Sequence, residues 1–234
     1  MKHSARRTVS LLALAAPVAL LCLVPGCGKR DEPYQPKPAY SGAKPKLPPV
    51  PTLPQKPIKD GDAYTVSGAI HHLRSRVHNH EVEGKEITVT GYIVKTNLPD
   101  APPCAVHKTG VADKDDCKPP LPAFWIADEL GEEKNVIRVL GWASNFANVH
   151  DAILHYDKKN VTEAYRDGFW DVEIPNPIPN VGAKVKVTGT YGIAFTNATS
   201  GVESDPLNGV LSYSRMTYIQ PPEEGGRLPG MKKR

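Results

Sequence analysis

Histidines are the residues of this sequence best suited to metal chemistry, and four of them, His71, His72, His78 and His80, stand within 67–80. Apolar residues at helical spacing predict one helix there: Ile70, Leu73 and Val77. On such a helix His71 and His78 share a side but lie about 10 Å apart along the axis. His72 and His80 point elsewhere, and none forms the i, i+4 pair typical of zinc helices. The sequence therefore predicts a solvated basic flank and no metal site.

Catalytic residues show no motif that would place a nucleophile beside a base. The sequence contains no G-x-S-x-G, no Walker-type loop and no H-E-x-x-H. His107 and His155 are isolated, and the neighbours His150 and Asp151 would diverge on a helix. We therefore expect a protein that is not an enzyme and that has no cofactor and no metal, although dispersed groups could still converge in space.

The two ends of the chain differ in composition from its middle. Residues 1–26 have a basic start and an apolar run, which indicates a secretory signal peptide too short to be a membrane span. Residues 27–60 are rich in proline and predict an extended stalk. Residues 221–234 predict a disordered tail. The folded domain is therefore expected over 61–220.

Cys104 and Cys117 are an even pair in a chain expected to be exported, where disulfides persist. Their spacing fits neither C-x-x-C nor the common zinc patterns, which disfavours a redox or metal pair. We therefore predict a disulfide that closes a polar loop and contributes roughly 3 kcal/mol of stability.

The end of the signal peptide, Val24-Pro25-Gly26-Cys27, resembles the lipobox of bacterial lipoproteins, whose cysteine is acylated and becomes the new N-terminus. The resemblance implies that Cys27 carries acyl chains such as palmitate, which would anchor the mature protein stably in a membrane of the cell envelope. Gly28 resembles outer-membrane sorting signals, so the outer membrane, facing periplasm or surface, is expected over the inner one. An ordinary signal peptide with an unmodified Cys27 is the alternative.

Charge is distributed unevenly along the chain. The whole chain has 29 Lys and Arg against 25 Asp and Glu, but residues 61–220 hold 15 against 20. Nucleic acid is therefore an unlikely partner, because phosphate binding needs clustered basic side chains. The basic stalk suits an anionic lipid surface.

Strand-like alternation is strongest over 83–96. Glu83–Gly91 matches Val181–Gly189 as x-G-x-x-(Ile/Val)-x-Val-Thr-Gly. The glycine ending each match, Gly91 or Gly189, is expected to be a bend or bulge point. Other elements follow from alternation: strands over 122–128, 135–142, 183–195 and 209–219. Helical spacing predicts a helix over 144–156 that Ser144 caps, with Phe146, Val149, Ile153 and Leu154 as its buried positions.

Five strands with a helix between the third and fourth is the order of an OB-fold. Over roughly 84–219 the chain resembles the OB-type domains of exported bacterial proteins. We therefore expect a mainly β fold with helices: a five-stranded OB-like Greek-key barrel, an N-terminal helix and a helical insertion between strands 3 and 4. A β-sandwich is the competing architecture.

OB-folds bind ligands on the face of strands two and three and with loops that here correspond to 97–120 and 196–208. The resemblance implies a face drawn from Phe124, Trp125, Ile126, Arg138, Leu140 and Trp142. Phe124, Ile126 and Leu140 could instead fill the interior. We take as the candidate ligand surface Trp125, Arg138, Trp142 and Tyr92. Trp125 is the strongest candidate because it alternates with two inward positions.

The function predicted from these features is a membrane-anchored, non-enzymatic binding module of the envelope. Its partners would be the membrane, through the lipid on Cys27, and an envelope protein or glycan. The alternatives are an OB domain that binds single-stranded nucleic acid or an oligosaccharide, and an envelope enzyme with an unrecognised site.

Overall fold

The computed structural model describes residues 56–106, 117–197 and 201–231. Contacts divide the chain into units 1–51 and 52–234, and all described residues belong to the second unit. The expected signal peptide, Cys27 and the stalk up to residue 55 lie outside the described residues. In the described part, no helix combines the length and the apolar character that crossing a bilayer requires.

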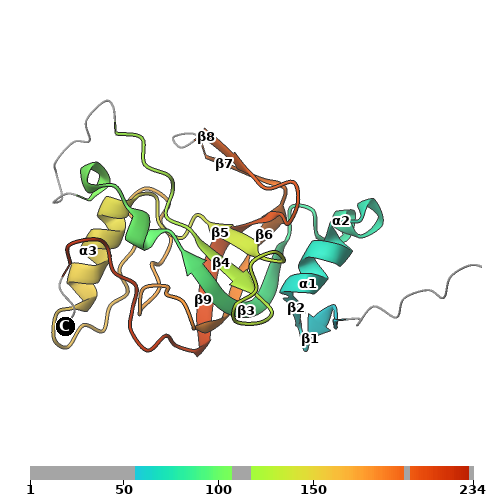
Figure 1. Ribbon diagram of the computed structural model, residues 1–234, viewed down its shortest axis with the longest axis horizontal. Helices are drawn as coiled ribbons and strands as arrows, with labels where there is room; N and C mark the ends of the chain where they lie inside the picture. The colour runs from blue at the N-terminus through green and yellow to red at the C-terminus, as the bar shows by residue number, and fades with distance from the viewer. Residues whose placement is uncertain (1–55, 107–116, 198–200, 232–234) are drawn as a thin grey trace, which may run out of the picture. The chain divides into compact units, whose positions relative to one another are not determined.

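The fold is mainly β with few helices (Figure 1). A large mixed sheet contains seven strands: β1 (Lys59–Asp60), β2 (Ala63–Thr65), β3 (Glu86–Thr96), β4 (Phe124–Ala127), β5 (Ile137–Leu140), β6 (Lys184–Gly192) and β9 (Val210–Gln220). A separate hairpin is formed by β7 (Ala194–Asn197) and β8 (Gly201–Ser204). The helical elements are α1 (Val66–Gly68), the π-helical turn η1 (Ala69–Leu73), α2 (Arg76–Val82), the 3₁₀ turns η2 (Leu98–Asp100) and η3 (Pro103–Ala105), and α3 (Phe146–Tyr156).

Strand pairings in the large sheet lead back to their starting point. The order runs β1-β2-β3-β4-β5-β9-β6, and β6 also pairs with β3, so five of the strands form a partial ring. The pairs β2–β3 and β5–β9 are parallel, whereas the other pairs are antiparallel. Figure 1 shows α3 at one end of this sheet and α1 with α2 at the other.

The two matching glycine-containing motifs pair directly with each other. Strands β3 and β6 are antiparallel with Thr88 opposite Thr188, and the hydroxyls of these residues are 2.9 Å apart. At Gly189 the register with β9 shifts, and an added Cβ would lie 2.0 Å from the Ser212 carbonyl oxygen. At Gly91 an added Cβ would lie 2.8 Å from the Ala127 carbonyl oxygen. Both glycines therefore stand where another strand's backbone approaches closely.

The interior of the sheet is filled by the inward side chains of its strands and by α3. Phe124 and Trp142 lie with ring centroids 6.1 Å apart, and both are buried. Helix α3 contributes Phe146, Val149 and Ile153, whereas Leu154 is exposed. The helical spacing of these residues predicted the first three correctly and Leu154 wrongly.

The single helix expected over 67–80 is interrupted at Ser75: α1 runs directly into η1, and α2 begins after the interruption. After η1 the chain turns at Ser75, whose extended backbone (ψ 131°) cannot continue a helix and whose hydroxyl caps Val77 at the start of α2. Val77, expected on the apolar stripe, is 69% exposed because α2 begins a new direction. The prediction of one continuous helix is wrong.

Residues 221–231, expected to be disordered, pack against the domain. Leu228 is 2% exposed within the core, and the Arg227 guanidinium binds the Asp157 carboxylate through two bonds of 2.7 and 2.8 Å. A bidentate pair of this kind fixes both position and orientation. Composition alone predicted disorder here because the segment is short, polar and rich in glycine and proline.

The predicted disulfide between Cys104 and Cys117 is confirmed, with Cα atoms 6.0 Å apart. Cys104 lies within η3, whose Ala105 is buried in the core. The segment 107–116 that it closes lies outside the described residues. The disulfide ties the start of the long β3–β4 connection to residues shortly before β4.

Candidate ligand-binding surface

Trp125 and Arg138 lie side by side on the outer face of β4 and β5. They are directly opposite each other in the antiparallel register and are partly exposed. Phe124 and Ile126, on either side of Trp125, are buried. Because successive side chains of a strand point to opposite faces, Trp125 must face away from the core.

A hollow of about 410 Å³ opens beside the Trp125 ring. It is lined by Val94, Lys95, Trp125, Glu132, Glu133 and Val136. The Lys95 ammonium lies 5.0 Å from the centroid of the Trp125 ring, within cation–π distance. An aromatic face with an ammonium and two carboxylates around it can stack on a ring and exchange hydrogen bonds with hydroxyl, amide or amino groups.

The β7–β8 hairpin covers the other part of this outer face. Phe195 of β7 is buried in a second apolar cluster with Leu140 and Val210, and Trp170 packs on Phe195 with ring centroids 5.9 Å apart. Glu203 of β8 forms a 3.1 Å ion pair with Arg138. Arg138 therefore holds the chain's own hairpin, and Trp125 remains beside the hollow.

Trp142, predicted on the ligand surface, is instead fully buried. Strict alternation from Arg138 through Leu140 would have placed Trp142 outward. Gly141 breaks that alternation, because its φ of +88° turns the backbone and directs Trp142 toward Phe124. The surface prediction for Trp142 is wrong.

Tyr92 lies on β3, half-buried, with the Lys184 ammonium 5.1 Å from its ring centroid. It does not line the hollow beside Trp125. Phe124 and Ile126 fill the core, and Leu140 is buried beneath the β7–β8 hairpin. The structure therefore brings together Trp125 and Arg138 and places Tyr92 and Trp142 elsewhere.

Lys95, Glu132 and Glu133 line the hollow but were not among the residues singled out from the sequence. Lys95 is opposite Trp125 in the β3–β4 register, so a correct strand pairing would have found it. The two glutamates belong to the acidic turn between β4 and β5, which composition alone marks as solvated. Glu132 and Glu133 line the hollow because the turn folds back toward Trp125.

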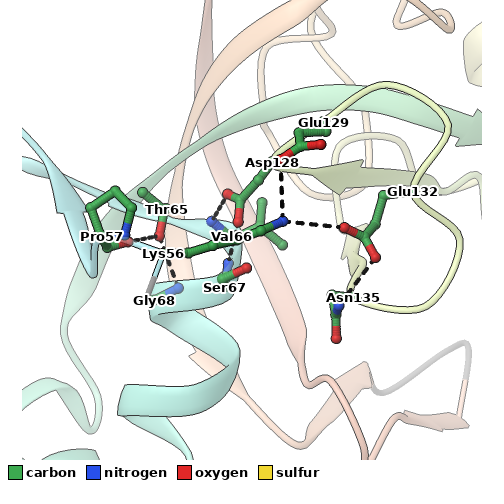
Figure 2. Close-up of polar contacts among 10 residues, drawn as sticks. All are labelled: Lys56, Pro57, Thr65, Val66, Ser67, Gly68, Asp128, Glu129, Glu132 and Asn135. Atoms are coloured by element: carbon green, nitrogen blue, oxygen red, sulfur yellow. Dashed lines mark hydrogen bonds and ion pairs between the residues drawn. The ribbon is translucent and has the colours of Figure 1, made fainter. Parts of the chain in front are cut away.

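The acidic turn also holds the start of the described chain, as Figure 2 shows. The Lys56 ammonium lies 3.5 Å from Glu129 and 3.4 Å from Glu132, and Asn135 donates to Glu132 over 3.1 Å. Desolvation acts to lower the pKa of Lys56, but the two carboxylates outweigh it and raise that pKa above its usual value. Glu132 therefore binds Lys56 of the N-terminal segment and also lines the hollow beside Trp125.

Asp128 holds the N-terminal segment through hydrogen bonds to its backbone, in addition to the ion pairs of Lys56. Its carboxylate accepts hydrogen bonds from the backbone N–H groups of Val66, at 2.7 Å, and Ser67, at 3.0 Å (Figure 2). Thr65 accepts from the Gly68 N–H over 2.9 Å and donates to the Pro57 carbonyl over 2.6 Å. The bonds from Val66, Ser67 and Gly68 satisfy N–H groups that begin α1 and have no partner inside the helix.

Basic side chains do not gather at this surface. Lys95 and Arg138 stand among Glu132, Glu133 and Glu203, and Arg138 is paired. A phosphate backbone is bound by clustered lysine and arginine, whereas in the described part of the chain the basic side chains of this face stand beside carboxylates.

No known protein-family profile matches the sequence, and neither does any curated protein. Among solved structures, a putative aspartyl-tRNA synthetase from Leishmania major Friedlin aligns at 12% identity and a TM-score of 0.31, over 76% of this chain and 24% of that chain. The Stn1–Ten1 complex of S. pombe aligns at 14% identity and a TM-score of 0.22, over 57% of each chain. This chain thus spans less than two thirds of either protein's length, and at these TM-scores neither similarity carries an argument about fold, ligand or partner.

Proposed function

We propose that the partial ring of strands is an OB-like Greek-key barrel. The supporting observation is connectivity: β3, β4 and β5 follow one another, α3 comes next, and β9 inserts between β5 and β6 while β6 returns to β3. The parallel pairing of β5 with β9 is the one that this connectivity requires. The outer face of β4 and β5 is then the ligand face of the fold.

The barrel serves as a non-enzymatic binding module whose ligand is a glycan or a protein segment of the cell envelope. The observation that carries this proposal is Trp125, partly exposed beside a hollow of about 410 Å³ with Lys95 near its ring. Indole faces stack on sugar rings or anchor apolar side chains, and carboxylates accept hydrogen bonds from hydroxyl or amino groups. The acidic surroundings favour such a ligand over nucleic acid.

Changing Trp125 to alanine is expected to weaken ligand binding by about 30-fold, because a central aromatic anchor contributes about 2 kcal/mol. The measurement is photocrosslinking from a reactive residue placed at Val136, another residue of the hollow, in intact envelopes. The amount of glycan or protein crosslinked to the chain should fall when Trp125 is changed to alanine. The matched control is Phe169→Ala, since Phe169 is an exposed aromatic, 72% accessible, that does not line the hollow.

An unchanged crosslinking pattern in Trp125→Ala would remove this surface from the proposal. Salt-sensitive retention of single-stranded DNA or RNA by the same protein would favour the nucleic-acid alternative. Turnover of a captured glycan or peptide would favour an enzyme.

The module is held at a membrane, with the outer membrane favoured, by lipid on Cys27. The support is the lipobox-like sequence Val24-Pro25-Gly26-Cys27, followed by Gly28 and a proline-rich segment. Two or more acyl chains anchor a protein stably, whereas one alone binds only marginally.

Replacing Cys27 with serine is expected to move the protein from the membrane fraction to the soluble fraction, because serine cannot carry the thioether-linked lipid. Cys22→Ser is the control, since it changes a nearby cysteine of the expected signal peptide and should leave fractionation unchanged. Membrane retention of the Cys27→Ser protein would contradict the lipid anchor.

A further inference from the structure

Two histidines expected to point apart are brought face to face by the break between η1 and α2. His72 lies in the π-helical turn η1 and His78 lies in α2, and their rings stack with centroids 3.8 Å apart and planes inclined by 17°. On one continuous helix residues six apart point in different directions. The geometric reason for excluding a metal site therefore does not hold in the folded protein.

A carboxylate completes the group. Glu81 lies one turn after His78, and its Oε1 is 3.2 Å from His78 Nδ1. One ligand atom from each of His72, His78 and Glu81 can be chosen so that all three lie within 4.8 Å of one another. Two ligands of one tetrahedral Zn²⁺, each about 2.0–2.1 Å from the ion, are separated by about 3.3 Å. The His78–Glu81 pair already has that separation, and the His72 ring must rotate out of its stack on His78 to direct a nitrogen toward the same ion.

The backbone that carries these three residues is fixed on both sides of the turn. Leu73, next to His72, is fully buried in the core. Asn79, next to His78, donates from its side-chain amide to the Leu73 carbonyl over 3.2 Å. Ser75 caps α2 between them through the Val77 N–H. Ligand groups held by supporting packing and hydrogen bonds lose less freedom when a metal ion binds.

We propose that His72, His78 and Glu81 form a binding site for a divalent first-row transition-metal ion, with Zn²⁺ as the representative ion. Two imidazoles and one carboxylate are a ligand set that such ions accept, and three protein ligands leave a fourth position for water or for an external ligand. All three side chains are at least partly exposed, so an ion has access from solvent. This proposal is independent of the function proposed for the Trp125 surface.

Isothermal titration of Zn²⁺ into the full chain, purified without a histidine tag, tests the site. One ion per chain is expected, and His72→Ala or His78→Ala should each weaken binding by at least about 10-fold. The matched controls are His71→Ala and His80→Ala, which alter exposed histidines of the same segment outside the group and should leave the affinity unchanged.

A second measurement separates loss of the site from loss of the fold. Zn²⁺ should raise the melting temperature of the unmodified chain and of the two controls, but not that of Glu81→Gln, whose apo protein should melt as the unmodified chain does. Replacement by Co²⁺ should give the visible absorption of a tetrahedral site. The proposal is overturned if no ion binds, if the control variants lose binding as much as His72→Ala and His78→Ala, or if Glu81→Gln keeps the full zinc-dependent shift.

Discussion

Changing Gly189 to alanine is expected to lower the free energy of unfolding by more than about 3 kcal/mol, because a Cβ there would lie 2.0 Å from the Ser212 carbonyl oxygen. The obstructing atom is backbone of the paired strand β9, so no side-chain rotation relieves the contact. Relief requires β6 and β9 to separate at the register shift beside Gly189. Urea denaturation followed by circular dichroism measures the loss.

Gly168→Ala is the control for this experiment. An added Cβ at Gly168 would meet no atom within 4 Å, and the residue does not have the positive φ that penalises alanine. Its stability should change by less than about 1 kcal/mol. Equal stability of the two alanine variants would show that the β6–β9 contact at Gly189 is not as close as the structure has it.

Changing Asp167 to alanine is expected to destabilise the protein by about 4 kcal/mol, because it removes a buried carboxylate that serves four donors. Asp167 is 1% exposed. It accepts hydrogen bonds from the backbone N–H and the hydroxyl of Ser144, both at 2.8 Å, and from the N–H groups of Phe169 and Trp170, at 2.9 and 3.0 Å. Thermal or urea unfolding measures the effect.

Asp62→Ala is the matched carboxylate control. The Asp62 side chain is 87% exposed and forms a 3.4 Å surface pair with Lys186, so its loss should destabilise the protein far less than the loss of Asp167. If Asp167→Ala were as mild as Asp62→Ala, the four donors at Asp167 must find other acceptors. That result would contradict the role given to this side chain in joining the start of α3 to the turn at 168–170.

Asp167 also explains an error of one residue in the expected start of α3. Serine before an apolar helical pattern predicts an N-cap, which placed the cap at Ser144. In the structure Ser144 bonds to Asp167, and Asn145 caps the helix by accepting from the Asn148 N–H over 2.8 Å. Both residues suit the position chemically, and a partner 23 residues away decides between them.

Local periodicity in the sequence predicted five of the seven strands of the large sheet, β3, β4, β5, β6 and β9, but not β1 or β2. Alternation over 83–96 and its counterpart at 181–189 correspond to β3 and the start of β6, which pair with each other. Alternation also placed Trp125 outward between the buried Phe124 and Ile126. These features follow from the chain's own geometry, since side chains two apart on a strand share a face whatever the strand pairs with.

Two of the errors occur where one residue resets the local geometry. Gly141 reverses the direction of Trp142, and Ser75 ends one helical piece and begins another, which brings His72 onto His78. Periodicity assumes that the backbone continues unchanged, so it fails wherever a positive φ or an extended residue interrupts an element.

The sequence by itself determined the β-rich character of the chain, the cysteine pair that bonds and the outward position of Trp125, because each depends on residue type and short-range spacing. Only the tertiary structure decided that Lys95, Glu132 and Glu133 surround Trp125, that His72, His78 and Glu81 converge, and that Leu228 joins the core. Strand register places Lys95 beside Trp125, and the interrupted helix brings His72 onto His78. The C-terminal segment folds back so that Leu228 packs in the core. These groupings arise from packing between distant segments, which no local pattern in the sequence records.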